Sequence, residues 1–392
     1  MPVDPKTAAR ERIERAREHL LDLSHRIHAR PELGMEEAQA CAWLCDALTG
    51  AGFAVERGVG GLETAFSARS GPGPLRVVVC AEYDALPGIG HACGHNVIAA
   101  MAAGAGMGLA AVADEVGVEV TVLGTPDEEA GGGKITLLER GAFDGAHAAM
   151  MVHPAPFDIV EMPIIAADQI SVRYRGKEAH AAAFPELGVN AADALVVAQT
   201  AIGLLRQHLR ATDRVHGIVT KGGDAPNVIP ALTEGTWLVR ARDLEELEDV
   251  QAKVMRCFEA GALATGAELE VTHDHLPYAE MHHDPGLAAL YRRNAEALGR
   301  ELLDALELGR AAGSTDMGNV SLAVPSIHPA IGIDSLPAVN HQPEFTAHCV
   351  TPAADKAVLD GAIAMAWTVI DAAADERLRT RLTQAAPGHT PS

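Results

Sequence analysis

The hexapeptide HACGHN at residues 91–96 places a thiol, Cys93, two positions before an imidazole, His95. These side chains could bind a metal ion, form a nucleophile with its base, or pack as ordinary residues at a strand-to-helix turn. A nucleophile and base two residues apart rarely reach each other, and no third group that would orient His95 is evident. Metal binding is favoured, because Gly94 permits the unusual backbone geometry that would let both side chains converge.

A pair of adjacent carboxylates, Glu128 and Glu129, lies in the glycine-rich segment GTPDEEAGGGK at residues 124–134. A phosphate-binding loop is excluded, because its motif requires glycine at position 128 and Ser or Thr after Lys134. The two carboxylates suit two different roles at a metal site. One carboxylate would bind a metal ion, and its neighbour would carry protons to and from the water that the metal activates.

Two further histidines complete a possible ligand set. His153 precedes Pro154 and adds a third soft ligand, and His341 in NHQPEF is a plausible distal ligand. Packing would be the better explanation for any one of these side chains, whereas their joint placement favours a metal site. A divalent cation lowers the pKa of bound water from 15.7 to about 7. One thiolate and several imidazoles favour Zn²⁺ over Mn²⁺ or Co²⁺.

The segments that position these residues alternate between apolar runs and helical patterns. Apolar runs at residues 75–81, 118–123 and 146–152 predict strands, and residues 96–113 predict a helix between the first two. Alternating strands and helices predict crossover units and a mainly parallel α/β sheet. Polar, potentially catalytic residues follow each run. Since open α/β sheets bind ligands beyond the carboxyl ends of their strands, we expect these residues to meet at one edge.

A second domain is predicted at residues 169–277, inserted into a catalytic domain of residues 1–168 and 278–392. The insertion follows the order strand, helix, strand, strand, helix, strand, which is typical of a ferredoxin-like α+β domain. Its strands are expected at residues 170–174, 216–220, 232–242 and 268–273, and its helices at 190–209 and 244–263. Another amphipathic helix is expected over residues 13–27, and residues 385–392 are expected to be disordered.

The composition limits the possible partners and location. The chain has 392 residues and a formal net charge of −22, which argues against nucleic acid or an anionic membrane as a partner. The most apolar stretch, residues 97–113, is short for a bilayer span and is interrupted by three glycines, and the N-terminus lacks the apolar segment of a signal peptide. Six scattered cysteines indicate reduced thiols in a cytoplasm.

Several motifs, in this order, resemble the metallopeptidases of the carboxypeptidase G and aminoacylase family. The likeness is strongest to the amidohydrolase branch with auxin-conjugate hydrolases, aminobenzoyl-glutamate hydrolases and a dipeptidase of β-alanyl-lysine type. The motifs that carry the resemblance are EYDALP (82–87), HACGHN, the segment with the Glu pair, VHP (152–154), GKEAHA (176–181), APNVIP (225–230), GSTDMGN (313–319) and NHQPEF (340–345).

The resemblance implies a role for each matching residue. Glu128 would be the general base, and His180 would stabilise the tetrahedral oxyanion, commonly from the other protomer of a homodimer. The inserted domain would be a lid and dimerisation domain. Asn227 would contact the substrate, with Arg240, Ser314 and Thr315 as weaker candidates. One or two divalent ions per protomer would be bound by Cys93, His95, Glu129, His153 and His341.

The sequence departs from the wider family in two places. Glu82-Tyr83-Asp84 stands where most relatives outside this branch carry His-x-Asp, and Asn96 stands where many branch members have Asp. Glu82 either binds the metal or hydrogen-bonds to a ligand, and the second is favoured. The leading hypothesis is metal-dependent hydrolysis of an amide in a dipeptide, an N-acyl amino acid or an aminobenzoyl-glutamate. The alternatives are an inactive relative that binds such ligands, which the presence of Glu128 disfavours, and a metal-free hydrolase built on Cys93.

Overall fold

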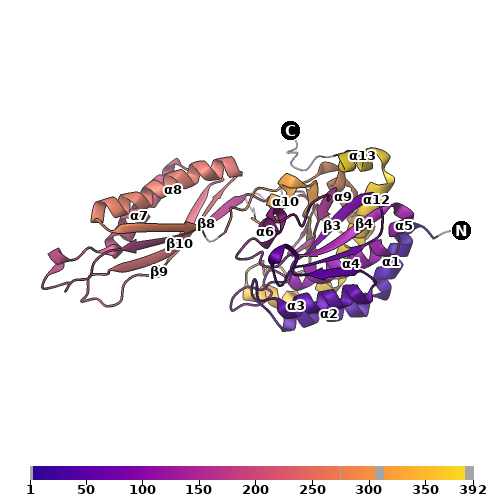
Figure 1. The fold of residues 1–392 in the computed structure, drawn as a ribbon, viewed down its shortest axis with the longest axis horizontal. Helices are drawn as coiled ribbons and strands as arrows, with labels where there is room; N and C mark the ends of the chain where they lie inside the picture. Colours follow the sequence, from indigo (N-terminus) through magenta and orange to yellow (C-terminus); the bar gives the residue numbers. More distant parts are fainter. Residues whose placement is uncertain (1–2, 274, 305–312, 385–392) are drawn as a thin grey trace. The chain divides into compact units, whose positions relative to one another are not determined.

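The computed structural model describes residues 3–273, 275–304 and 313–384, so the predicted disorder of residues 385–392 lies outside the described part of the chain (Figure 1). The chain forms two compact units, which are described separately. Unit 1 comprises residues 1–163 and 281–392, and unit 2 comprises residues 164–280. These limits lie a few residues from the domain boundaries expected from the sequence.

Unit 1 is built on a six-stranded sheet in the order β1-β2-β4-β3-β5-β13. The pairs β3–β4, β3–β5 and β5–β13 are parallel, whereas β1 and β2 form an antiparallel edge next to β4. The continuous apolar run of β3 is buried on both faces, as a central parallel strand requires. The strands are β1 (Ala54–Arg57), β2 (Phe66–Ser70), β3 (Leu75–Ala81), β4 (Val118–Gly124), β5 (Ala148–Met150) and β13 (Ser326–Ile327).

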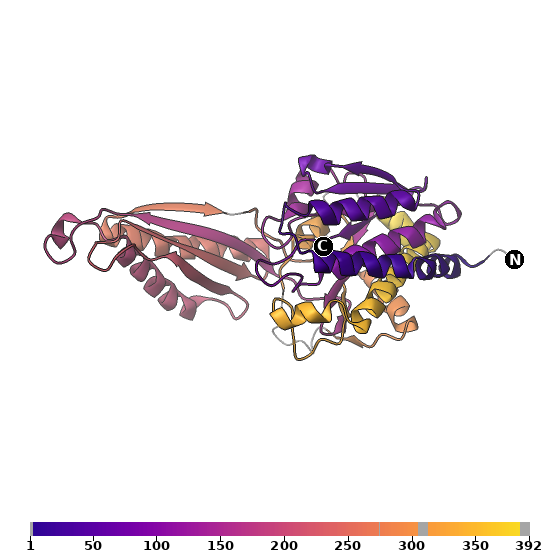
Figure 2. The same ribbon diagram turned by 90° about the horizontal axis from the view of Figure 1, so that it is seen from below.

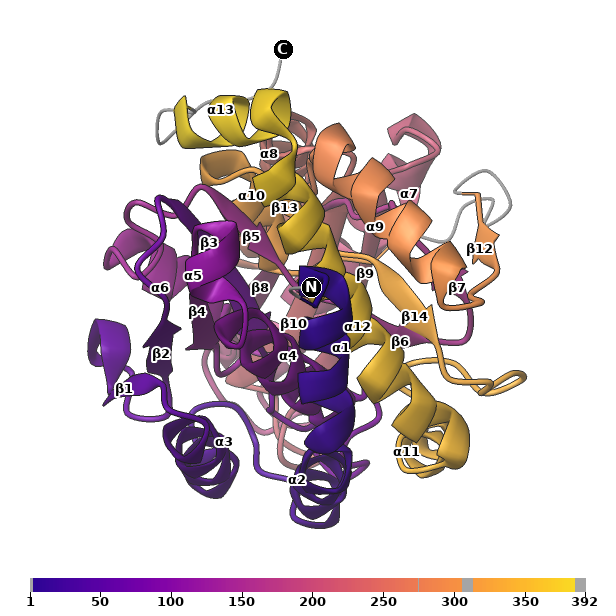
Figure 3. The same cartoon turned by 90° about the vertical axis from the view of Figure 1, so that its right-hand side faces the viewer.

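Helix α4 (His95–Ala110) runs through the core of unit 1, with α1 (Pro5–Arg15) and α12 (Pro352–Ala374) packed beside it (Figure 3). Its glycines let neighbouring elements approach closely. A Cβ added at Gly106 would lie 2.3 Å from Cγ2 of Val122 on β4. The remaining helices are α2 (Arg17–Ala29), α3 (Ala38–Gly50), α5 (Ala113–Val116), α6 (Gly133–Glu139), α9 (Pro285–Ala297), α10 (Met317–Ala323), α11 (Pro343–His348) and α13 (Glu376–Gln384).

Within the described residues, α12 is the one helix long and apolar enough to cross a membrane by length and composition. It differs from residues 97–113, the stretch considered for this role from the sequence. In the structure, 78% of the most apolar window of α12 is buried, and the helix packs against α1, α4 and α9. This burial is that of a core helix in a globular domain.

Two expectations for unit 1 needed correction. The run at residues 146–152 is not one strand: β5 ends at Met150, and the chain then enters a second sheet through β6 (His153–Ala155). This sheet has the order β12-β7-β14-β6 and adds β7 (Asp158–Ile159), β12 (Leu302–Leu303) and β14 (Ala330–Gly332). The helix expected over residues 13–27 is divided into α1 and α2 at Ala16.

Unit 2 has the expected order of elements and a ferredoxin-like topology. Its antiparallel sheet has the order β11-β8-β10-β9, and α7 and α8 pack on each other and against one face of it (Figures 1 and 2). The alternating burial along β10 follows from this one-sided packing. The elements are β8 (Ala166–Arg175), α7 (Ala191–Leu205), β9 (Arg214–Lys221), β10 (Leu232–Ala241), α8 (Leu244–Thr265) and β11 (Glu268–His273).

Candidate metal centre

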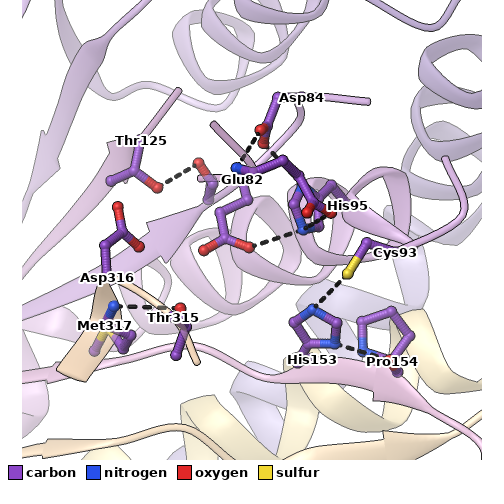
Figure 4. Close-up of polar contacts among 12 residues, drawn as sticks. Glu82, Asp84, Cys93, His95, Thr125, His153, Pro154, Thr315, Asp316 and Met317 are labelled. Atoms are coloured by element: carbon purple, nitrogen blue, oxygen red, sulfur yellow. Dashed lines mark hydrogen bonds and ion pairs between the residues drawn. The ribbon is translucent and has the colours of Figure 1, made fainter. Parts of the chain in front are cut away.

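The thiol and imidazoles singled out in unit 1 converge at one point. Gly94 adopts a left-handed backbone with φ of 81°, a conformation that glycine permits, and it precedes α4, which begins at His95. Sγ of Cys93 lies 3.4 Å from Nε2 of His153 and 3.4 Å from Nε2 of His341 (Figure 4 shows Cys93 and His153). One ligand atom from each of Cys93, His95 and His153 lies within 4.8 Å of the others.

The carboxylate pair completes the cluster. Cys93, Glu129 and His341 form a second group whose ligand atoms lie within 4.8 Å of one another, and His95, Glu128 and Glu129 form a third. All five expected ligands, from four segments of the sequence, therefore meet beside the expected general base. His348, another histidine of the same segment, belongs to none of the ligand groups found among the described residues.

Two buried atoms of this cluster support binding of a cation. Nε2 of His95 and Oε1 of Glu129 have no hydrogen-bond partner within the described residues, although they lie 3.8 Å apart and Nε2 of His95 also lies 3.3 Å from Oε2 of Glu82. Leaving such buried atoms without a hydrogen bond costs free energy, whereas a cation between them would satisfy both. The donor set of one thiol, three imidazoles and a carboxylate matches the preferences of zinc and similar divalent metals. The residues therefore fit the ion that the sequence predicted.

Asp84, just beyond β3, orients two of these groups. Its Oδ1 lies 2.8 Å from Nδ1 of His95, and its Oδ2 accepts a hydrogen bond of 3.0 Å from the backbone N–H of Glu129 (Figure 4). A carboxylate on Nδ1 leaves Nε2 of His95 directed at the cluster. The ring of His153 is fixed in the same way, because its Nδ1 lies 2.8 Å from the carbonyl oxygen of Pro154.

Burial and neighbouring charges shift the pKa values of residues in this cluster. Burial lowers the pKa of His153 to about 4, so this imidazole is neutral and able to bind a metal near pH 7. Burial raises the pKa of Cys93, and the carboxylate of Glu129 adds to the shift. Burial, together with Glu82 and Glu129, raises the pKa of Glu128. A divalent cation would oppose the last two shifts, because its charge favours the ionised thiolate and carboxylate.

Lys134 is buried beside this centre, a position that the sequence did not reveal. Its ammonium forms ion pairs with Glu82 and with Oδ1 of Asp316, the latter at 2.6 Å, and its backbone N–H donates to Oδ2 of Asp316. Ligand atoms of Glu82, Glu128 and Asp316 lie within 4.8 Å of one another. The ammonium thus supplies positive charge where three carboxylates gather, and it pairs with one oxygen of Glu82, whose other oxygen, Oε2, lies 3.3 Å from Nε2 of His95.

Replacing Lys134 by methionine is expected to destabilise the protein strongly. The variant leaves Glu82 and Asp316 buried without their shared cation, which typically costs about 3–5 kcal/mol. Denaturant unfolding of the metal-loaded protein measures the change. Lys356→Met is the matched control, because it removes an exposed pair with Asp360 that contributes at most about 1 kcal/mol. Equal effects of the two variants would contradict this role for Lys134.

The other predicted site residues belong to none of the ligand groups found among the described residues. Ser314 and Thr315 precede α10 in unit 1, and the Thr315 hydroxyl accepts a hydrogen bond of 3.3 Å from the N–H of Met317. His180, Asn227 and Arg240 belong to unit 2. His180 and Asn227 lie on facing segments, because the N–H of residue 181 donates to the Asn227 carbonyl.

The imidazole of His180 is exposed, and its local contacts fix its tautomer. Its Nδ1 accepts hydrogen bonds from the backbone N–H groups of Ala182 and Ala183, at 3.3 and 3.2 Å. Nε2 therefore carries the proton of the neutral ring and can donate a hydrogen bond to an oxygen atom. Arg240 lies on β10, opposite Arg214 of β9, and burial lowers the pKa of its guanidinium.

Comparison with known proteins identifies relatives of this chain. Residues 78–368 match the family described as peptidase family M20/M25/M40. The chain is 42% identical over 386 residues to the Xaa-Arg dipeptidase of Mus musculus, covering 93% of this chain and 88% of that protein. It is 34% identical over 283 residues to a p-aminobenzoyl-glutamate hydrolase subunit of Escherichia coli, covering 67% of this chain and 59% of that protein.

A solved structure shares the fold. It is a Bacillus subtilis protein described as a dinuclear metal binding peptidase from the M20 family, with a TM-score of 0.66 and 22% identity, covering 89% of this chain and 98% of that one. The family match spans most of the chain and includes both Glu128 and the four expected ligand segments. This chain is a member of peptidase family M20/M25/M40, and it is an enzyme that hydrolyses amide bonds.

Proposed function

We propose that the protein is a metal-dependent hydrolase of a small amide, with Glu128 as its general base. The observation that carries this proposal is the convergence of Cys93, His95, Glu129, His153 and His341 next to Glu128. Bound there, one or two divalent ions, with zinc favoured over manganese or cobalt, would act as a Lewis acid and make water nucleophilic near pH 7. The thiol and the imidazoles support zinc.

Residues of the chain carry out the proton transfer, the orientation of groups and the binding of the substrate. Glu128 takes a proton from the attacking water and returns it to the leaving amine, which contributes on the order of 10²–10⁴ in rate. Asp84 keeps His95 oriented, and Lys134 balances the charge of Glu82 and Asp316 next to the base. His180 donates a hydrogen bond from its Nε2–H to the developing oxyanion, and Asn227, with Arg240, Ser314 and Thr315, binds the substrate.

The substrate class follows from the relatives. We infer a dipeptide, an N-acyl amino acid or an aminobenzoyl-glutamate, because the relatives are named an Xaa-Arg dipeptidase and a p-aminobenzoyl-glutamate hydrolase. The net charge of −22 supports a small molecule rather than nucleic acid or an anionic membrane as the partner. All six cysteines are free thiols, which supports a cytoplasmic location.

Unit 2 is proposed to serve as lid and dimerisation domain of a homodimer. Its edge strand β9 presents Ile218 and Val219 to solvent, and α7 presents Val196 and Leu204. An unpaired strand edge and exposed apolar side chains on one domain are typical of a surface that pairs with a second copy.

A substrate panel tests the proposed activity. Protein stripped of metal by a chelator and then reloaded with Zn²⁺, Mn²⁺ or Co²⁺ is assayed on Xaa-Arg dipeptides, β-alanyl dipeptides, N-acyl amino acids and aminobenzoyl-glutamate. Reloaded protein is expected to cleave at least one class, and stripped protein none. Cleavage that survives thorough metal removal would favour a hydrolase built on Cys93. Binding of these compounds without cleavage would favour an inactive relative.

His180→Ala is expected to lower kcat by about 10²–10³-fold with little change in bound metal, because one oxyanion donor is lost. Steady-state kinetics on the substrate found above measure the effect, and His208→Ala, an exposed histidine of the same unit, is the control.

Mixing inactive His180→Ala with inactive Glu128→Gln is expected to restore activity, since a mixed dimer would hold one complete site. No recovery in verified mixed dimers would contradict a contribution across protomers.

A further inference from the structure

The turn that carries Glu128 has a backbone that needs support. Residues 125–132 connect β4 to α6, and Asp127 adopts a left-handed backbone with φ of 62°. A residue with a Cβ disfavours this conformation, so surrounding contacts must hold it in place. Glu128 is the next residue, and the direction of its side chain therefore depends on what fixes the peptide of Asp127.

Glu37, 90 residues earlier at the start of α3, holds that peptide. Its Oε1 accepts a hydrogen bond of 2.9 Å from the backbone N–H of Asp127, and its Oε2 accepts one of 2.9 Å from the Thr64 hydroxyl. The Thr64 carbonyl in turn accepts a hydrogen bond from the Tyr83 hydroxyl at 2.5 Å. Glu37 has no exposed surface, so both carboxylate oxygens are committed inside the protein.

The side chain of Asp127 is also confined. A Cβ added at Gly34 would lie 1.9 Å from its Oδ1, and one at Gly131 would lie 1.8 Å from its Oδ2. The segment before α3 therefore packs directly against the turn. Beyond Glu128, the N–H of Glu129 donates to Oδ2 of Asp84. Residues on both sides of the general base are thus held through their backbone N–H groups by buried carboxylates.

We propose that Glu37 is a positioning residue for Glu128: through the Asp127 peptide it sets the placement of the base relative to the metal ligands. The proposal rests on the assignment of Glu128 as general base. Glu37 touches neither the ligand cluster nor any reacting atom, and it acts through hydrogen-bond geometry. Burial raises its pKa to about 7, so the contact does not require a fully ionised carboxyl group. A neutral amide oxygen in the same place should therefore perform the same task.

Two substitutions at residue 37 distinguish an effect on the position of Glu128 from a general loss of protein stability. Glu37→Asp is one methylene too short to reach Asp127, whereas Glu37→Gln keeps the acceptor oxygen. In the metal-loaded enzyme, Glu37→Asp is expected to lower kcat on the order of 10²-fold, as a displacement of about 1 Å at a catalytic group does. KM and bound metal are expected to stay near wild type. Glu37→Gln is expected to remain within a few-fold of wild-type kcat.

Glu32 provides the matched control. It lies in the same segment, and its carboxylate accepts from the N–H groups of Gln39 and Ala40 at the start of α3, without touching the turn. Glu32→Gln is expected to change thermal stability more than kcat. Amide hydrogen exchange of residues 124–133, followed by mass spectrometry, is expected to be faster in Glu37→Asp than in wild type and unchanged in Glu32→Gln.

Gly34→Ala gives a second route if Glu37→Asp does not fold, because its new methyl group would lie 1.9 Å from Oδ1 of Asp127 and displace that side chain. It is expected to show the same loss of kcat with unchanged bound metal. Wild-type kcat in Glu37→Asp or Gly34→Ala would overturn the proposal, as would equal losses in Glu37→Asp and Glu37→Gln. An active Glu128→Gln variant would instead overturn the proposed function itself, so the two failures are distinguishable.

Discussion

Replacing Glu128 by glutamine is expected to lower kcat by about 10²–10⁴-fold, because the amide cannot accept a proton from water. KM and bound metal are expected to remain near their wild-type values, since Glu129 rather than Glu128 is the proposed ligand. Steady-state kinetics together with elemental analysis of the purified variant measure all three quantities. The substitution keeps the size of the side chain, so the turn at Asp127 should be preserved.

Glu139→Gln is the control for this variant, since Glu139 is an exposed carboxylate on α6 of the same unit. It is expected to leave kcat unchanged. A Glu128→Gln enzyme with near-normal turnover would remove Glu128 from the role of base. A variant that lost its metal as well as its turnover would point to Glu128 as a ligand, and the division of labour within the Glu pair would then be reversed.

Replacing His153 by alanine is expected to abolish activity by releasing metal. Even partners that only orient a ligand typically contribute 10–100-fold in metal affinity, so loss of a ligand is expected to cost at least about 10²-fold. Metal retained after dialysis is the direct measurement, and excess metal in the assay should restore part of the activity. His147→Ala serves as the control, because the Nδ1 of His147 only accepts a hydrogen bond from the N–H of Arg76. Full metal content in His153→Ala would exclude His153 from the ligand set.

Much of the fold follows from local patterns in the sequence. The strand expected at residues 75–81 is β3, because its residues are mostly apolar, and that expected at 268–273 is β11, because apolar and polar residues alternate along it. The expected helix between the first two strands is α4. No residue in the sequence indicates that the first helix is divided at Ala16, because neither proline nor glycine stands there. The short length of β5 depends on the second sheet that begins at His153, and a local pattern does not show which sheet a strand joins.

The candidate centre was predictable where residue type alone indicates chemistry. A thiol, imidazoles and carboxylates just beyond buried strands pointed to one edge of the sheet, and the structure gathers them there. The supporting residues were not predictable in the same way. In the sequence, Lys134 suggests only the lysine of a phosphate-binding loop, which the surrounding residues exclude. Its burial between Glu82 and Asp316 is a property of the tertiary fold, so the sequence does not show it. Glu37 likewise lies far from residues 125–132 in the sequence, and only the tertiary fold brings its carboxylate to this turn.

The central claim is that Cys93 and the imidazoles around it share a divalent ion, and X-ray absorption of the zinc-loaded protein tests it most directly. We predict one sulfur ligand at about 2.3 Å and imidazole nitrogens at about 2.0–2.1 Å from the metal, with the sulfur contribution lost in Cys93→Ser. A zinc ion surrounded by oxygen alone, or a sulfur contribution that persists in Cys93→Ser, would contradict the account.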